Sequence, residues 1–155
     1  MQNLAATINY TLQDKLQKLV SFLGQVNREL DAIAEEIDNV NLKTAMLTAA
    51  VESKQYAKEI CYQLQQLNIS IAVDHKDQIW QQVEEDINQD TWLVQGGEIA
   101  TLCTDCEKYF SKLYEDVLAE YFPYKKLKEI ISFQLYAARC SFMRIRLLNS
   151  LRFDQ

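Results

Sequence analysis

Residues 12–37 read LQDKLQKLVSFLGQVNRELDAIAEEI and contain the clearest periodic signal in the chain. Apolar side chains recur here at alternating steps of four and three residues. They are Leu12, Leu16, Leu19, Leu23, Val26, Leu30, Ile33 and Ile37. Because an α-helix has about 3.6 residues per turn, this spacing places all of them on one side of a long helix. A stripe sustained over this length is typical of a helix packed in a bundle or coiled coil.

Three more stretches have helical periodicity, so we expect four long helices at about 11–37, 41–67, 98–121 and 125–151. The inward positions of the second are Met46, Ala50, Ser53, Ala57, Ile60, Leu64 and Leu67. Those of the third are Ile99, Cys103, Cys106, Phe110, Leu113 and Val117, and those of the fourth are Ile131, Leu135, Ala138, Phe142 and Ile145. Residues 38–41 and Pro123 mark two short turns, and Gly96-Gly97 is expected to act as a strong stop.

The composition supports one all-α domain over residues 1–155. The chain has only three glycines and one proline, which is too few turn residues for an all-β fold of this length. The connection at about 68–97 is long and is expected to contain a short helix whose apolar face includes Trp80. A 25-residue helix spans about 38 Å, so this link can cross the whole bundle and leave the second and third helices parallel. One long crossover predicts a ferritin-like four-helix bundle rather than an up-down-up-down bundle.

The charge distribution argues against nucleic-acid binding. The net charge is −6, whereas a nucleic-acid surface needs a basic excess. Residues 1–121 contain 9 Lys+Arg and 20 Asp+Glu, and residues 122–155 contain 7 and 2. The basic last helix can pair with acidic neighbours inside the bundle or form a polar docking surface for a partner.

No stretch of about 18 apolar residues is present, so we expect no membrane partner. Residues 1–10 lack the basic and apolar regions of a secretory signal. These features predict a cytoplasmic protein with reduced thiols.

Two segments, RELDAIAEEIDN at 28–39 and EKYFSKLYEDVL at 107–118, resemble a bacterial family of ferritin-like four-helix-bundle proteins whose function is not established. The resemblance extends from about Leu12 to Leu151. It implies the ferritin-like fold and a stress-related or accessory role.

The ligands of a ferritin-type di-iron centre are missing. Such centres take a glutamate from each of two helices and Glu-x-x-His from each of the other two. The only histidine, His75, lies in the predicted crossover, and residues 55 and 62 of the second helix are Gln and Tyr where histidines would follow Glu52 and Glu59. We therefore expect no cofactor and rank di-iron chemistry last.

Cysteines give the one alternative chemistry. Cys103 and Cys106 form a C-x-x-C on one helix face, and Cys140 is expected at nearly the same level, since residue 106 should face about residue 141. Three clustered thiols could hold a metal or respond to redox change, whereas Cys61 should lie about 18–22 Å away along the bundle. The opposing interpretation is that the cysteines are small core residues, and we favour no metal site.

Trp80 and Trp92 in the crossover are candidate interaction residues, which either seal the crossover onto the bundle or anchor another subunit. With the missing ligands, they favour a non-enzymatic bundle that acts by association, with itself as a homo-oligomer or with a protein partner. A metal- or redox-responsive protein using the three thiols is the alternative.

Overall fold

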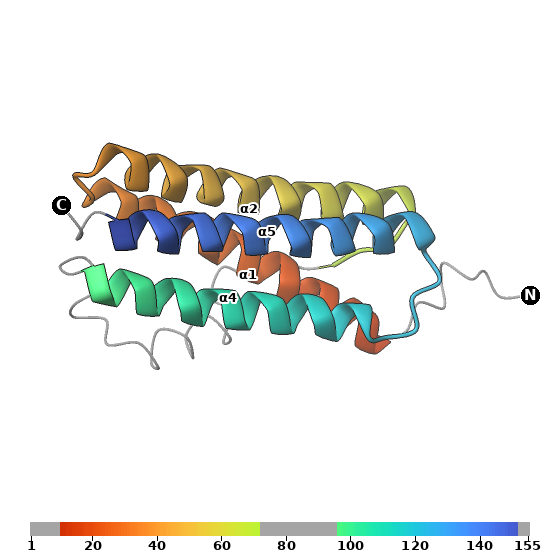
Figure 1. Cartoon of the computed structure of the whole chain (residues 1–155). Helices are drawn as coiled ribbons and strands as arrows, with labels where there is room; N and C mark the ends of the chain where they lie inside the picture. Colours follow the sequence, from red (N-terminus) through yellow and green to blue (C-terminus); the bar gives the residue numbers. More distant parts are fainter. Residues whose placement is uncertain (1–9, 72–95, 152–155) are drawn as a thin grey trace, which may run out of the picture.

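The four periodic stretches of the sequence fold as four long helices (Figure 1). The computed structural model describes residues 10–71 and 96–151. The helices are α1, Tyr10–Glu35; α2, Val40–Gln66; α4, Gly96–Leu118; and α5, Lys125–Leu151. Within the described ranges the chain has no strand, so the all-α bundle predicted from the sequence is confirmed there. None of these helices is long and apolar enough to cross a membrane.

Helix α4 begins two residues before the predicted start at about residue 98, with Gly96-Gly97 as its first residues. The prediction that these glycines stop a preceding helix concerns residues outside the described ranges. The first N–H groups of a helix have no intrahelical partner, so the low helix propensity of glycine matters less there than in an interior turn. The other end of α4 lies at Leu118, earlier than the predicted Tyr121. The chain then turns toward Pro123, and the residue before a proline is biased away from helix.

An asparagine lies at each end of α2. The side chain of Asn39 accepts a hydrogen bond from the Leu42 backbone N–H at 2.9 Å, which caps the start of the helix. At the other end Asn68 has a φ of +59°, in the left-handed region that asparagine tolerates better than most residues. The Ile69 N–H then donates to the Leu64 carbonyl at 2.9 Å, which closes the last turn and buries Ile69.

Each helix has two antiparallel neighbours. Helix α1 packs against α2 and α4, and α5 packs against the same two helices. Lys15, near the start of α1, bonds Glu120 just beyond the end of α4, so α1 and α4 run in opposite directions. Since short turns also join α1 to α2 and α4 to α5, helices α2 and α4 run in the same direction (Figure 1).

The predicted crossover falls largely outside the described residues. Residues 72–95 include its short helix, His75, Trp80 and Trp92, so these predictions are not tested by the structure. What is described is the exit from α2, where Gln13 of α1 donates a hydrogen bond to the Ser70 carbonyl at 2.5 Å. The chain therefore leaves α2 beside the start of α1.

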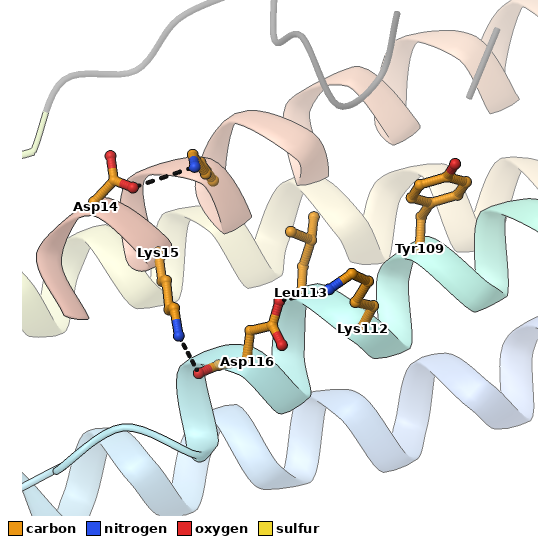
Figure 2. Close-up of a pocket in the computed structure, with 7 residues that line it drawn as sticks. Asp14, Lys15, Tyr109, Lys112, Leu113 and Asp116 are labelled. Atoms are coloured by element: carbon orange, nitrogen blue, oxygen red, sulfur yellow. Dashed lines mark hydrogen bonds and ion pairs between the residues drawn. The ribbon is translucent and has the colours of Figure 1, made fainter. Parts of the chain in front are cut away.

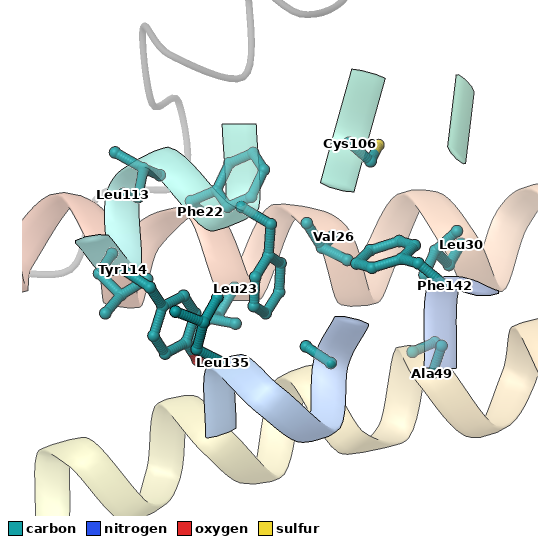
Figure 3. Packing of buried hydrophobic residues seen from close by; sticks show 14 of the residues in the cluster. Phe22, Leu23, Val26, Leu30, Ala49, Cys106, Leu113, Tyr114, Leu135 and Phe142 are labelled. Carbon is teal, nitrogen blue, oxygen red and sulfur yellow. The ribbon is translucent and has the colours of Figure 1, made fainter. Parts of the chain in front are cut away.

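The core lies between the four inward stripes predicted from the sequence. Every predicted inward position of α1, α4 and α5 is buried, and in α2 only Ala57 and Leu67 are merely half-buried. Aromatic rings of α1, α4 and α5 meet in the core, and Figure 3 labels Phe22, Tyr114 and Phe142 among them. The Phe110 ring lies 4.7 Å from Tyr114, 5.6 Å from Phe142 and 6.1 Å from Phe22, measured between ring centroids. Small residues of α2 allow close approach, since the Asn27 side chain reaches the Ala50 carbonyl at 2.8 Å.

Candidate association surface

Helix α5 has apolar residues on two opposite faces. One face is the inward stripe of the core. The other, which we call the outer stripe, comprises Phe133, Tyr136, Cys140, Met143, Leu147 and Leu151. All six residues are exposed, and the five large ones have exposed fractions between 48% and 70%.

The spacing of the outer stripe is that of a helix–helix seam. Its residues follow one another at steps of three or four, so they share one side of α5. At about 100° per residue this side is nearly opposite the buried Ile131, Ala138 and Phe142. An amphipathic surface helix normally presents polar residues on that side. A continuous exposed apolar stripe of this length makes this side of α5 the candidate association surface.

Arginines beside the outer stripe are largely neutralised by α4. Arg139 Nη2 lies 3.1 Å from Glu115 Oε2, and Arg139 Nε donates to Ser111 Oγ at 3.2 Å. Arg146 pairs with Glu107 two turns further along. Arg144, on the other flank of the stripe, has no ion pair in residues 10–71 and 96–151. Two of the six basic residues of α5, Arg139 and Arg146, are thus paired inside the bundle, whereas Lys125, Lys126 and Lys128, like Arg144, have no ion pair among the described residues. The two sequence interpretations of the basic last helix, internal pairing and a polar docking surface, both stay open.

A buried hydrogen-bond network fixes which side of α5 faces inward. Tyr114 Oη donates to Gln134 Oε1 at 2.9 Å, and both side chains are fully buried. The amide nitrogen of Gln134 donates to Glu59 Oε1 at 3.0 Å and to the Tyr56 carbonyl at 3.3 Å. Because these partners come from α4 and α2, a rotation of α5 would leave polar atoms buried without partners. These hydrogen bonds of Gln134 therefore hold the outer stripe toward solvent.

Burial raises the pKa of both tyrosines in this region. The pKa of Tyr114 lies well above its ordinary value because its hydroxyl is removed from water. Burial also raises the pKa of Tyr56 to about 12, and the nearby carboxylates of Glu52 and Glu59 add to this effect. Both phenols are thus neutral hydrogen-bonding groups at neutral pH. Glu52 in turn accepts a hydrogen bond from Ser141 Oγ at 2.8 Å, which gives α2 and α5 a second polar contact.

A hollow of about 260 Å³ lies between α1 and α4, and its charges are paired (Figure 2). Lys15 bonds Glu120 at 2.7 Å, and this hydrogen bond raises the pKa of Lys15. Two ion pairs of 3.2 Å, Lys18 with Asp14 and Lys112 with Asp116, occupy the same hollow. Because each lysine already has a carboxylate partner, no unpaired positive charge converges there to hold an anion.

The structure does not bring the three predicted thiols together. Cys103 and Cys106 are buried in the core, as their spacing predicted, whereas Cys140 is exposed on the outer stripe. The predicted level of Cys140 was also wrong, since the pairing of Glu107 with Arg146 places Cys106 level with about residue 147. In the described part of the chain no group of three His, Cys, Asp or Glu side chains could hold a metal ion.

Burial also makes the two core thiols poor nucleophiles. It raises the pKa of Cys103 to about 12 and that of Cys106 well above its ordinary value. We expect a thiol-specific disulfide reagent at pH 8 to modify Cys140 at least tenfold faster than Cys103 or Cys106, since only Cys140 is exposed. Peptide mapping after timed labelling measures the three rates, and labelling in denaturant is the control in which they should converge. Equal rates in the folded protein would contradict the burial of Cys103 and Cys106.

Sequence reasoning missed both features that define this surface. The outer stripe was present in the sequence as a second set of apolar residues at helical spacing. The inward stripe alone was enough to predict a helix there, so the second set was not interpreted. Gln134 and Tyr114 gave no periodic signal, because a polar residue on the inward side looks like a break in the pattern.

Comparisons with known proteins find no match to this chain. No protein-family model matches it, and neither the curated proteins nor the solved structures give a significant match.

Proposed function

We propose that this chain is a non-enzymatic helical-bundle protein that acts by association, and that the outer stripe of α5 is its binding surface. The supporting observation is that α5 presents a continuous apolar face to solvent directly opposite its core face. Water-exposed apolar area on this scale is unfavourable in an isolated chain and is relieved when a partner covers it.

We also propose the ferritin-like topology for the whole chain, as the resemblance implies. Its support is that α2 and α4 run in the same direction, so the residues between Gln66 and Gly96 connect opposite ends of the bundle. A cytoplasmic location and a stress-related role remain predictions from the sequence and the resemblance.

The chemistry of the described residues gives the alternatives less support. Of the thiols proposed for a metal or redox site, Cys103 and Cys106 of α4 lie in the core, whereas Cys140 of α5 is exposed to solvent. Among the described residues, no buried polar side chain is a carboxylate, and Tyr114 and Gln134 are hydrogen-bonded to one another rather than arranged as metal ligands.

The experiment that tests this function is the particle size of the chain in native cell extract. We expect the wild-type chain to sediment as a species larger than a single chain. The double variant Phe133→Glu/Leu147→Glu should return at least 80% of it to the monomer position, because two negative charges would be buried unpaired in any complex formed through the stripe. Both positions are exposed, so the thermal unfolding midpoint should change little.

A matched control is Val51→Glu/Tyr62→Glu on α2. These residues are also apolar and exposed, at 52% and 57%, and the substitutions add the same charge. The control should sediment as the wild type does. If wild type, stripe variant and control all sediment alike, the outer stripe is not a binding surface and the proposed function fails.

A further inference from the structure

We propose that the outer stripe of α5 binds the outer stripe of a second copy of this chain, with the two helices antiparallel about a two-fold axis between Cys140 and Met143. This inference rests on the proposed function and names the partner for the same surface. Three properties of the stripe support it: its symmetric spacing, its area and the state of the charges beside it.

The spacing of the stripe is nearly the same in both directions along α5. Reversal about the point midway between Cys140 and Met143 brings Tyr136 opposite Leu147 of the second copy, and Phe133 within one residue of Leu151. Each aromatic ring thus lies beside an aliphatic side chain of the second copy. A two-fold dimer requires one patch that is complementary to itself, which this stripe is. Steps of three and four are also those that antiparallel helices use at a seam.

The exposed area is enough for a small specific interface. From exposed fractions of 48–70% and a surface of about 150–250 Å² per large side chain, the stripe presents on the order of 500 Å². Two copies would therefore bury about 1,000 Å² in total, which is near the lower bound for a specific protein interface. A face of this size fits a reversible dimer rather than an obligate one.

The charges favour a second copy over an anionic partner. Arg139 and Arg146 are already paired with Glu115 and Glu107 of α4, so they offer little to an acidic protein or an anionic membrane. In the two-fold arrangement Arg144, which has no ion pair in residues 10–71 and 96–151, lies level with Arg139 of the second copy. The two arginines stand on opposite flanks of the seam, and Arg139 is already paired with Glu115. The six residues of the stripe between these flanks include no charged residue, so the seam itself is apolar.

The test uses the purified full-length chain alone in sedimentation equilibrium from micromolar to several hundred micromolar. We expect a monomer–dimer equilibrium that moves to monomer by at least tenfold in dissociation constant in Phe133→Glu/Leu147→Glu. The Val51→Glu/Tyr62→Glu control should keep the wild-type constant. Circular dichroism on the same samples confirms that each variant is folded.

Direction is tested by mixing the wild type with Cys140→Ser/Met143→Cys under mild oxidation. Antiparallel pairing places position 140 opposite position 143, so covalent dimers should form mainly between the two proteins, at least threefold above either protein alone. Covalent dimers mainly of like with like would indicate parallel helices and would overturn the two-fold arrangement.

The remaining outcomes separate this inference from the proposed function. A wild type that stays monomeric at several hundred micromolar, yet sediments as a stripe-dependent complex in extract, overturns the second copy and leaves association with a different protein. A dimer that persists in the stripe variant also overturns the inference, because another face would then hold it.

Discussion

Replacing Phe110 by alanine is expected to lower the free energy of unfolding by about 3–5 kcal/mol. The ring is almost fully buried and contacts aromatic rings from three helices, namely Phe22, Tyr114 and Phe142. Its removal loses the transfer free energy of the side chain and leaves a cavity that rigid helices cannot close. Urea denaturation followed by circular dichroism gives the change from the shift in midpoint at constant slope.

The chain supplies its own control for this substitution. Phe133→Ala removes the same atoms from the outer stripe of α5, where the side chain is 70% exposed. Measured on the monomer at low protein concentration, it should change the free energy of unfolding by no more than about 0.5 kcal/mol. Similar losses at the two positions would mean that Phe110 is not at the centre of the core, or that the outward side of α5 is covered within the monomer.

The second large effect is expected at the hydrogen bond between Tyr114 and Gln134. Gln134→Leu leaves the Tyr114 hydroxyl buried without an acceptor, and Tyr114→Phe leaves the Gln134 amide oxygen without its donor. Each single change should cost about 1–3 kcal/mol, because an unpaired buried polar group loses its hydration with no compensation. The same denaturation experiment measures both variants.

The double variant Tyr114→Phe/Gln134→Leu should cost less than the sum of the two single variants by about 0.5–3 kcal/mol. With both partners apolar, the groups that lose a hydrogen bond are the carboxylate of Glu59, whose side chain reaches water, and the backbone carbonyl of Tyr56. Additive losses would show that the two side chains do not act as a pair. The rotation of α5 in the bundle would then have to be fixed by apolar packing alone.

The fold was predictable because bundle helices carry their burial pattern in the sequence. Leu12 through Ile37 repeat at the period of a helix, and all eight of these residues are buried. The ends were less predictable: a glycine pair that breaks a helix in its interior costs little in its first turn, so α4 begins at Gly96 rather than after it. Asn39 and Asn68, by contrast, mark the ends of α2 by their own chemistry.

The candidate site was predictable only in part. The missing metal ligands favoured the prediction of association. The tryptophans predicted as interaction residues lie outside the described residues. The predicted cysteine cluster was wrong because Cys140 is exposed and because the turn between two helices sets their register. Counting back from Pro123 misplaced that register by between one and two turns. The Glu107–Arg146 pair fixes the register that counting could not.

The sequence by itself determined that this chain forms long helices and which side of each one is apolar, because helical periodicity is a local property of neighbouring residues. The sequence also predicted the core side of α5, and only the tertiary structure showed that its second apolar side stays exposed. Both sides of that helix are apolar, so hydrophobic burial alone does not choose between them. The choice depends on partners far away in the sequence, since Gln134 must meet Tyr114 of α4 and Glu59 of α2, and burying it elsewhere would leave these groups unpaired.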